Sequence, residues 1–375
     1  MKRLRRVLLA FALVLVALLV AVKCAYGGGR PYPDVSTPPR IPDGDVVRAV
    51  GLDFPLGNVT GTSTGRIFFN LHPFAQAHRF TDAFLFELVD GEPRPYPSAA
   101  AQAGLRHMFG MTADRQGRLW LVSPAALDRP GTRLIAYDLA TDERVVDHTF
   151  ASGVARFAQD MRVLPDGRRM ILADTGAFHF TSAALLVLDL ETFAVRRVLA
   201  GHPSTQPQDW FIRTDRGPHR IGFGLITFAV GVDGIALSDD GVWAYYATMS
   251  HDSLYRVRTA DLLDASLDDA DLGRRVERVG PKPLSDGIAV TADGAVLITD
   301  IENGGIARLS AGGDLETLTR SRDVVWADGV HVTPTGEVWF TDSAIPSYLD
   351  PLLRAPSRAA LRRDAPHGLY RFRLP

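Results

Sequence analysis

The sequence predicts an all-β fold, a six-bladed β-propeller with four-stranded blades. A motif of apolar strand, Gly-bearing turn and second β-rich strand recurs six times at intervals of about 40 to 75 residues, which is typical of repeat architectures. No long amphipathic helix pattern interrupts the repeats, and radial closure hides strand edges that separate sheets would expose. The six copies are Gly57–Asn70, Phe109–Ser123, Gln159–Asp174, Asp233–Thr248, Asp286–Asp300 and Asp328–Asp342.

The first element is an apolar N-terminal segment, residues 1–25. It opens with the basic stretch KRLRR, which is followed by 16 apolar residues, Val7–Val22. This arrangement is typical of an export signal, and the run is slightly short for a membrane span. We expect either a signal peptide with a cleavage site near Ala25-Tyr26-Gly27 or a retained N-terminal anchor. In both cases the rest of the chain is secreted or periplasmic, and it is tethered if the segment is retained.

Residues 26–44 are rich in Gly and Pro and predict a linker, and residues 45–375 are expected to form the propeller. Val46–Val50 is expected to pair with the last blade, so that an N-terminal strand closes the ring. Further strands after each repeat complete the four-stranded blades. They are expected at Phe84–Val89, Leu134–Leu139, Val145–Phe150, Leu185–Leu190, Ala194–Leu199, Ser253–Arg258, Gly305–Ser310, Leu315–Thr319 and Gly368–Leu374.

The composition excludes several kinds of site and partner. Cys24 is the only cysteine, so the exported part has no disulfide, thiolate metal site or cysteine nucleophile. The formal net charge of −2 becomes −7 without the five basic residues up to Lys23, which argues against nucleic acid as a partner. Membrane contact is expected only through the N-terminal segment. Schiff-base chemistry would depend on Lys282, the only lysine after Lys23.

The end of the propeller where inner strands begin and second strands end, here called the loop face, carries the longest connections. These are Leu71–Asp82, Gly201–Val232 and Ser343–His367. Connections of that length are uncommon unless they are functional. Eight residues before the turn glycine, three successive repeats place Asp233, Asp286 and Asp328 at this face. Gln159 holds that place in the third repeat, with Asp160 one residue out of register.

A second polar group lies at the same face, where the second strands end. It consists of Asn70, Asp174, Asp300, Asn303 and Asp342. Together with Asp233, Asp286 and Asp328, this group is expected to bind a small-molecule ligand, such as an amine, or to hold a proton through raised pKa values. No cofactor is predicted with certainty, but Asp233, Asp286 and Asp328 would suit Ca²⁺ or another divalent cation. The alternative is structural, since aspartates at strand ends also accept backbone N–H bonds.

Histidines and aromatic residues are also frequent in the loop-face connections. His179 and His251 lie closest to strand ends and are the best general acid/base candidates, so His179 and Asp286 are the predicted catalytic residues. Flat rings beside carboxylates suit an aromatic or amine-bearing ligand, although the same rings could simply pin the loops. The candidate rings are Trp210, Phe211, Phe223, Trp326 and Tyr348.

With the repeats aligned, the chain resembles the major royal jelly and yellow protein family in its bacterial form, related to dopachrome tautomerase. The segments that carry the resemblance are GNVTGTSTGRIFFNL (Gly57–Leu71), LIAYDLATDERVV (Leu134–Val146), ALLVLDLETFAVRRVL (Ala184–Leu199), VDGIALSDDGVWAYYATMSHDSLYRV (Val232–Val257) and LSDGIAVTADGAVLITD (Leu284–Asp300). The resemblance implies a secreted six-bladed propeller. Some insect members are linked to dopachrome conversion or to the binding of biogenic amines.

A weaker resemblance is to the senescence marker protein and gluconolactonase family, which is also six-bladed. Those enzymes hold one divalent cation with a Glu, two amides and an Asp at the blade mouths. Asp286 matches the family's Asp, whereas Asp233 and Gln159 stand where Asn is usual. The expected Glu has no counterpart in Leu56-Gly57-Asn58, which puts this metal site in doubt.

Three functions remain open from the sequence. The first is a tautomerase-like isomerase that acts on an aromatic quinone or amine ligand at the loop face. The second is a lactone hydrolase in which a cation activates water. The third is a non-catalytic amine-binding or protein-binding module. The sequence makes no prediction of oligomeric state.

Overall fold

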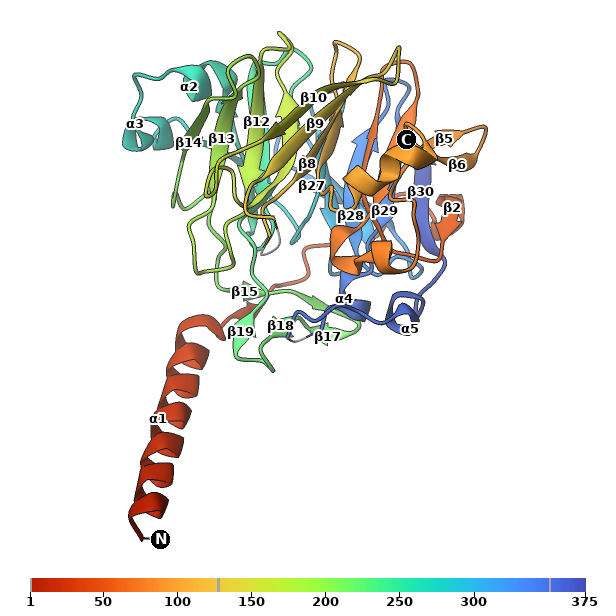
Figure 1. The fold of residues 1–375 in the computed structure, drawn as a ribbon. Helices are drawn as coiled ribbons and strands as arrows, with labels where there is room; N and C mark the ends of the chain where they lie inside the picture. The colour runs from red at the N-terminus through yellow and green to blue at the C-terminus, as the bar shows by residue number, and fades with distance from the viewer. Residues whose placement is uncertain (1, 127–128, 351) are drawn as a thin grey trace.

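The structure is a computed structural model that describes residues 2–126, 129–350 and 352–375. It confirms the predicted six-bladed β-propeller, built from six four-stranded antiparallel sheets (Figure 1). The inner strands of neighbouring sheets contact one another all round the ring, in the order β3, β7, β11, β20, β24, β28 and back to β3.

Each sheet is a blade whose strands follow one another outward from the axis. The first blade consists of β3 (Leu56–Gly61), β4 (Ile67–Leu71), β5 (Leu85–Val89) and β6 (Glu92–Pro95). The second consists of β7 (Met111–Ala113), β8 (Arg118–Ser123), β9 (Arg133–Asp138) and β10 (Arg144–Thr149). The third consists of β11 (Ala158–Val163), β12 (Arg169–Asp174), β13 (Ala184–Asp189) and β14 (Val195–Val198).

The remaining three blades have the same plan. The fourth consists of β20 (Val232–Leu237), β21 (Trp243–Thr248), β22 (Ser253–Arg258) and β23 (Glu277–Pro281), with α2 (Thr259–Leu263) and α3 (Asp269–Gly273) before its last strand. The fifth consists of β24 (Ile288–Val290), β25 (Val296–Asp300), β26 (Gly305–Leu309) and β27 (Leu315–Arg320). The sixth consists of β28 (Ala327–Val332), β29 (Glu337–Asp342), β30 (His367–Arg373) and β2 (Val47–Leu52).

The sixth blade takes strands from both ends of the propeller. Its outermost strand, β2, pairs antiparallel with β30, so that Val47 lies opposite Arg371 and Leu52 lies opposite His367. The edge of β30 therefore has a hydrogen-bonded partner on both sides.

The second strand of each blade is buried on both of its faces. In β12, for example, Met170 to Asp174 are all buried. Because each blade packs between two others, this strand has no solvent-facing side, and its residues are apolar in succession instead of alternating with polar ones.

The turn between the first and second strands contains a left-handed glycine in every blade. The φ angles run from 69° at Gly167 to 90° at Gly65. A side chain is strained in this region of backbone space, which explains the recurrence of glycine in the repeat. The six turn glycines are Gly65, Gly117, Gly167, Gly241, Gly294 and Gly336.

The loop face lies at the lower end of the propeller in Figure 1 and carries several short elements. The long connection before β20 folds into β15 (Trp210–Phe211), β16 (Arg213–Thr214), β17 (Gly217–Pro218), β18 (Arg220–Ile221) and β19 (Ile226–Thr227). The connection before β30 contains α4 (Ile345–Tyr348) and α5 (Arg358–Leu361). Short 3₁₀ helices lie at Asp43–Asp45, Pro73–Ala75, Ala77–Arg79 and Ala99–Leu105.

The N-terminal segment forms α1 (Lys2–Tyr26), which projects away from the propeller (Figure 1). Among the described residues it is the one helix long and apolar enough to span a membrane, although a signal sequence has the same properties. The Gly/Pro-rich segment that follows lies along the propeller. Its β1 (Arg30–Pro31) pairs with β15, and its Tyr32 and Ile41 are buried.

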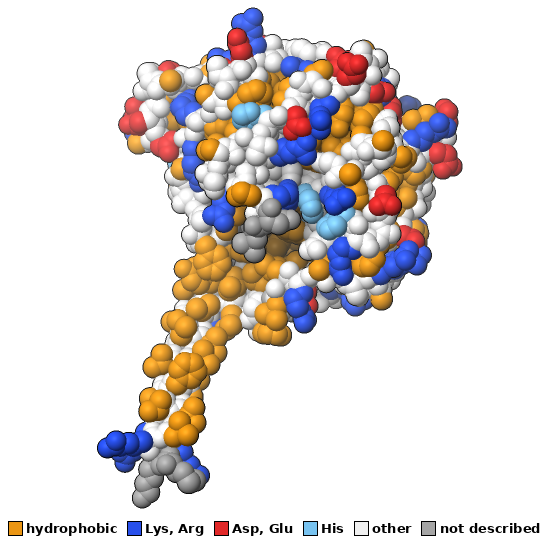
Figure 2. Space-filling model, in the orientation of Figure 1, with side chains coloured by type: hydrophobic (Ala, Val, Ile, Leu, Met, Phe, Trp, Pro, Cys, Tyr) orange, Lys and Arg blue, Asp and Glu red, His pale blue; other side chains and the backbone are white. Residues whose placement is uncertain are grey.

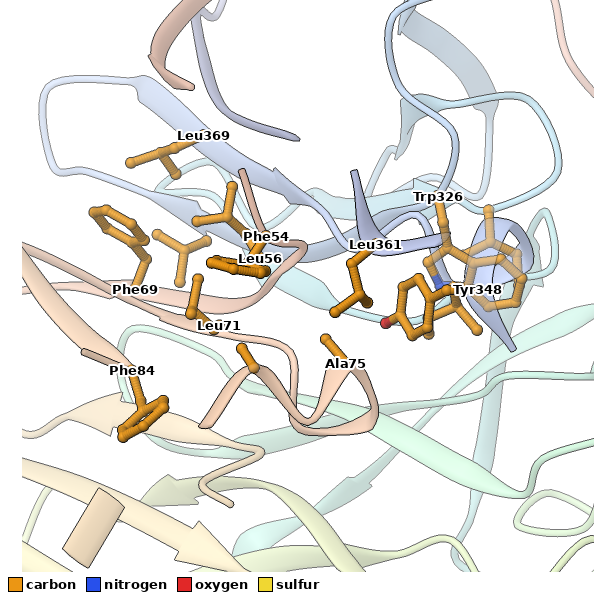
Figure 3. Packing of buried hydrophobic residues seen from close by; sticks show 14 of the residues in the cluster. Phe54, Leu56, Phe69, Leu71, Ala75, Phe84, Trp326, Tyr348, Leu361 and Leu369 are labelled. Atoms are coloured by element: carbon orange, nitrogen blue, oxygen red, sulfur yellow. The ribbon is translucent and has the colours of Figure 1, made fainter. Parts of the chain in front are cut away.

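One hydrophobic cluster ties the loop face to the first and sixth blades. It contains Leu71 at the end of β4, Ala75 after it, Trp326 before β28, Tyr348 of α4 and Leu361 of α5. Figure 3 shows these side chains converging on one another from separate segments of the chain. The cluster therefore fixes α4 and α5 in place over the beginnings of the inner strands.

We predict that Gly329→Ala destabilises the propeller. A Cβ at Gly329 would lie 2.7 Å from the Val59 nitrogen and 2.8 Å from the Asn58 Cα, so two inner strands would have to separate. Overpacking of this kind costs about 1–3 kcal/mol in the free energy of unfolding. Thermal or denaturant unfolding measures the change. Gly44→Ala is the control, since no described atom lies within 4 Å of its Cβ, and equal stability of both variants would contradict the prediction.

Candidate functional site

A cavity of about 670 Å³ opens at the loop face. Asp350, which follows α4, lines it, and so do four aspartates that each lie at or next to the beginning of an inner strand. They are Asp160 on β11, Asp233 on β20, Asp286 before β24 and Asp328 on β28, here called the acidic cluster. Aromatic rings line the cavity as well, namely those of Phe74, Phe109, Phe157, Phe178, Phe228 and Tyr348.

The glycine after each predicted aspartate brings the inner strands close together. A Cβ at Gly234 would lie 2.7 Å from the carbonyl oxygen of Asp286, and one at Gly287 would lie 2.7 Å from that of Asp328. The Asp-Gly pairs therefore do not form turns here. They permit a backbone approach that a larger residue would prevent, and in doing so they gather the carboxylates.

Asp160 is the cluster member with the most hydrogen-bond partners. Its carboxylate accepts bonds from the backbone nitrogens of Met161 (2.8 Å) and Ile235 (3.1 Å) and from Nη1 of Arg162 (2.9 Å). The strand pairing is irregular between Ala158 and Met161, as it is at the equivalent place in the sixth blade, between Ala327 and Val330. These bonds hold the Asp160 side chain in place at the cavity.

Asp233 is buried and Asp286 is partly buried, and both hold their protons more tightly than ordinary aspartates. Burial, and next the negative charge of Asp160, raise the pKa of Asp286 to about 6, although Trp326 Nε1 donates a 2.8 Å bond to its Oδ2. Burial also raises the pKa of Asp233 well above its ordinary value, reinforced by Asp286, Asp160 and Asp328. The pKa values of these two carboxyl groups are raised because burial and neighbouring negative charge both disfavour the ionised form.

Asp328 faces a histidine that the sequence did not distinguish from its neighbours. Oδ2 of Asp328 is buried, has no hydrogen-bond partner among the described residues, and lies 3.8 Å from Nε2 of His72. Burial raises the pKa of Asp328 well above its usual range, and so do the nearby charges of Asp286, Asp342 and Asp160. The cluster therefore contains a buried carboxyl oxygen whose hydrogen-bonding capacity is not used by the described residues.

His72 is neutral, and its proton position follows from its hydrogen bonds. Burial lowers its pKa to about 3. Its Nδ1 accepts a bond from the backbone nitrogen of Phe74 (3.2 Å) and lies 3.2 Å from the Tyr348 hydroxyl. An accepting Nδ1 assigns the ring proton to Nε2, the atom that faces Asp328.

The second polar group predicted from the sequence does not line this cavity. Asp342 Oδ1 accepts bonds from the backbone nitrogens of Val325, Trp326 and Ala344. Asp174 accepts from the Gly176 nitrogen and from Arg197. Asp300 accepts from Asn303, whose own Oδ1 accepts from Arg320. The structure thus places Asp174, Asp300, Asn303 and Asp342 where they hold the loops, beside the acidic cluster and not within it.

The predicted catalytic histidine also lies outside the cavity lining. His179 is exposed and follows Phe178, which does line the cavity, and partial desolvation lowers the pKa of His179. His251 is buried, and its Nδ1 accepts a bond from the Ser253 nitrogen. His72 takes their place at the site. In the sequence His72 directly follows the second strand of the first blade, and several other histidines have a similar position. Only its contact with Asp328 in the tertiary structure distinguishes it.

Some of the aromatic residues predicted for the site lie at the cavity, and others lie away from it. Tyr348 lines the cavity, and Trp326 reaches it through its bond to Asp286. Trp210 packs against Tyr32, with ring centroids 5.1 Å apart, and Phe223 is exposed to solvent. Lys282 is fully buried, with its Nζ bonded to Ser285 and to the Pro283 carbonyl, and it does not line the cavity.

The acidic cluster does not form a ready metal site. Within the described ranges, no group of three or more His, Cys, Asp or Glu side chains is placed to hold a metal ion. The amide of Asn58, which also lines the cavity, already accepts a bond from the Val59 nitrogen through its Oδ1. The donors at Asp233, Asp286 and Asp328 therefore do not fit the divalent cation suggested by the sequence.

Comparison with known proteins places the chain in a family. The sequence pattern described as "Major royal jelly protein" matches residues 108–350. The chain belongs to the major royal jelly protein family. A search of curated proteins found no match.

Solved structures share the fold of this family member at low sequence identity. A gluconolactonase from Xanthomonas campestris has a TM-score of 0.55 at 13% identity, covering 93% of this chain and 98% of that one. A luciferin-regenerating enzyme has a TM-score of 0.52 at 10% identity, covering 87% and 94%. A glucose dehydrogenase-type protein from Thermus thermophilus has a TM-score of 0.51 at 12% identity, covering 87% and 98%. At these identities the likeness shows the propeller fold alone.

We predict that this royal jelly family protein loses stability as the pH rises through about 6 and that Asp286→Asn removes this loss. The folded state raises the Asp286 pKa from 3.8 to about 6, so it binds the proton more tightly than the unfolded chain does. This contribution to stability is present below about pH 4 and is lost as the pH rises through 6. Asparagine removes the dependence, with a difference on the order of 1–3 kcal/mol between pH 4 and pH 8.

Denaturant unfolding at both pH values measures this difference. Asp239→Asn is the control, because the Asp239 side chain is 87% exposed in a turn remote from the cavity. The interpretation of Asp286 is wrong if both variants show the same pH dependence.

Proposed function

We propose that the chain binds a small aromatic molecule with a basic nitrogen in the loop-face cavity. The observation that carries the proposal is the acidic cluster facing a wall of aromatic rings within one cavity. A protonated amine complements the carboxylates, and a flat ring complements the phenylalanine side chains and Tyr348. The ligand would act outside the cytoplasm, in keeping with the N-terminal segment.

Binding of such a cation requires the cluster to release a proton. The pKa of Asp286 lies at about 6 in the unliganded protein, and those of Asp233 and Asp328 are also raised. An ammonium group stabilises the carboxylate form, so it displaces a proton as it binds. Affinity should therefore rise with pH through about 6.

A second function, tautomerisation of a quinone-like aromatic of the dopachrome type, is favoured by the same titration. A carboxylate of Asp286 or Asp328 would take a proton from a ring carbon, and the carboxylic acid formed would return a proton to the quinone oxygen, to which His72 Nε2 would donate a hydrogen bond. The reaction is an isomerisation and consumes no oxidant. A carboxyl group with a pKa near neutrality suits both directions of this transfer.

The other activities suggested by the sequence have less support. A metal-dependent lactone hydrolase needs a bound cation, and the described acidic residues are not arranged to hold one. The mildly acidic composition gives no surface for nucleic acid. A protein-binding role has no specific observation in its favour.

We predict that dopamine or serotonin binds to the full-length protein and that Asp286→Asn weakens the affinity about tenfold or more. Loss of one buried charge partner commonly costs at least the 1.4 kcal/mol that corresponds to a factor of ten. Isothermal titration calorimetry in detergent, at pH 5 and pH 8, measures affinity and proton release.

Glu302→Gln is the matched control. Burial raises the pKa of Glu302 to about 7, yet this residue does not line the cavity. Equal weakening by both variants, or affinity that falls from pH 5 to pH 8, would rule out the acidic cluster as the amine site.

We predict that the protein accelerates the loss of dopachrome absorbance if the cavity catalyses proton transfer. His72→Asn should then lower kcat by about 10²-fold or more while ligand affinity changes little, because the hydrogen-bond donor to the developing negative oxygen is lost. His148→Gln is the control, since His148 stacks on Phe193 at the outer strand β10. Amine binding without any acceleration would leave the protein a binding module and exclude the tautomerase.

A further inference from the structure

We propose that α1 is retained as a membrane anchor and that the loop face rests on the bilayer, with Phe180, Phe223 and Leu352–Leu353 in the lipid interface. The cavity would then open at the membrane surface. The proposal concerns the placement of the whole molecule and is independent of which ligand the cavity binds.

The composition of α1 suits a membrane span with its N-terminus in the cytoplasm. The 25-residue helix is about 37 Å long at 1.5 Å per residue, and its most apolar stretch has a mean hydropathy of 2.9. Its large apolar side chains are exposed along its length, so they need a cover that the described part of the protein does not supply. Arginines at positions 3, 5 and 6 mark the cytoplasmic end, which places the propeller on the opposite side.

The end of α1 is fixed to the loop face and is not joined to it by a free linker. Lys23 Nζ donates to the Gly224 carbonyl, and the Arg220 guanidinium donates a 2.9 Å bond to the Gly27 carbonyl. The Thr227 hydroxyl donates a 2.6 Å bond to the Gly28 carbonyl, and the next residues form β1. Because these contacts fix where α1 leaves the propeller, a helix that spans the bilayer brings the loop face to the membrane (Figure 1).

The same contacts occupy the segment where a signal peptide would be cut. The helix continues through Tyr26, whose ring lies 4.5 Å from that of Phe180, and Gly27 is buried. A Cβ at Gly27 would lie 2.3 Å from the Leu225 carbonyl oxygen. In the folded protein Tyr26 and Gly27 therefore pack against the propeller, whereas Ala25 is exposed.

Exposed apolar side chains gather at this face. Of the nine exposed large hydrophobic residues described outside α1, five lie in loop-face connections. They are Phe74 (40% exposed), Phe180 (49%), Phe223 (77%), Leu352 (51%) and Leu353 (53%). Figure 2 shows the apolar surface of α1 continuing onto the adjoining edge of the propeller. A patch continuous with a spanning helix has the bilayer as its natural partner.

Phe223 is the side chain best placed to enter the lipid. It lies at the tip of the β18–β19 hairpin with φ 55°, between Gly222 and Gly224, which also have positive φ. The tip contacts the end of α1 through Lys23. The apolar run of α1 has 16 residues and is about 24 Å long, whereas the hydrocarbon core of a bilayer is about 30 Å thick. Because the run is shorter than the core, aromatic rings at its outer end would lie at the lipid interface, where such rings concentrate.

The placement has a consequence for the ligand, which rests on the proposed function. Phe74 and Leu353 belong both to the exposed apolar set and to the lining of the cavity. A molecule that partitions into the lipid interface would reach the acidic cluster past these two side chains. Amphipathic aromatic amines partition in this way, which makes them better ligands than strongly polar ones.

Depth measurements on the full-length chain in lipid nanodiscs test the proposal. In a Cys24→Ser background, Phe223→Cys carries an environment-sensitive NBD probe, and Val145→Cys is the control. Val145 is also an exposed apolar residue (52%), but it lies on the outer strand β10. Nanodiscs of phosphatidylcholine and phosphatidylglycerol contain a nitroxide-labelled lipid near the headgroups.

We expect the probe at position 223 to be quenched several-fold more by the nitroxide lipid than the probe at position 145, and to be protected from aqueous iodide. Equal iodide quenching at the two positions would overturn the proposal. Mass spectrometry of the protein purified from membranes gives a second readout, and a mature chain lacking α1 would also overturn it. Calorimetry in detergent does not depend on the bilayer, so failure here leaves amine binding in the cavity intact.

Discussion

The arrangement of the site depends on the close approach of neighbouring inner strands. Glycines at 234, 287 and 329 leave no room for a side chain against the next strand. Each of them follows an aspartate, so the approach that closes the ring also brings carboxylates into one dry space. Packing and charge are thus coupled, because the strands cannot move apart to relieve the repulsion without breaking contacts all round the propeller.

Keeping several negative charges close together in a buried site costs free energy, and the members of the acidic cluster offset that cost in different ways. Asp160 is compensated by Arg162 and two backbone nitrogens. Asp233, Asp286 and Asp328 have raised pKa values because of burial and, after it, of the negative charge of neighbouring aspartates. Sites with this pattern exchange stability for the capacity to bind a cation or to move a proton. The propeller frame, with its fully buried second strands, supplies the stability that the cluster removes.

The loop face also joins two features that are distant in the chain. The N-terminal helix ends against the β18–β19 hairpin, and the cavity is covered from another side by α4 and its neighbours. The segment between α1 and the first propeller strand contributes buried residues, such as Tyr32 and Ile41, and so acts as part of the folded body. A composition rich in glycine and proline did not reveal this, because short backbone pairings such as β1 with β15 depend on a partner far along the sequence.

The sequence alone determined the number of blades, the equivalent turns and the three aspartates in register, because these follow from local periodicity and from backbone positions that only glycine fills. Tertiary structure decided the rest. His72 meets Asp328, and Asp160 joins the cluster although it is one residue out of register, whereas Asp300 and Asp342 turn to loop backbone. Such choices depend on which side chains neighbouring blades bring into contact, and a one-dimensional pattern contains no record of those distances.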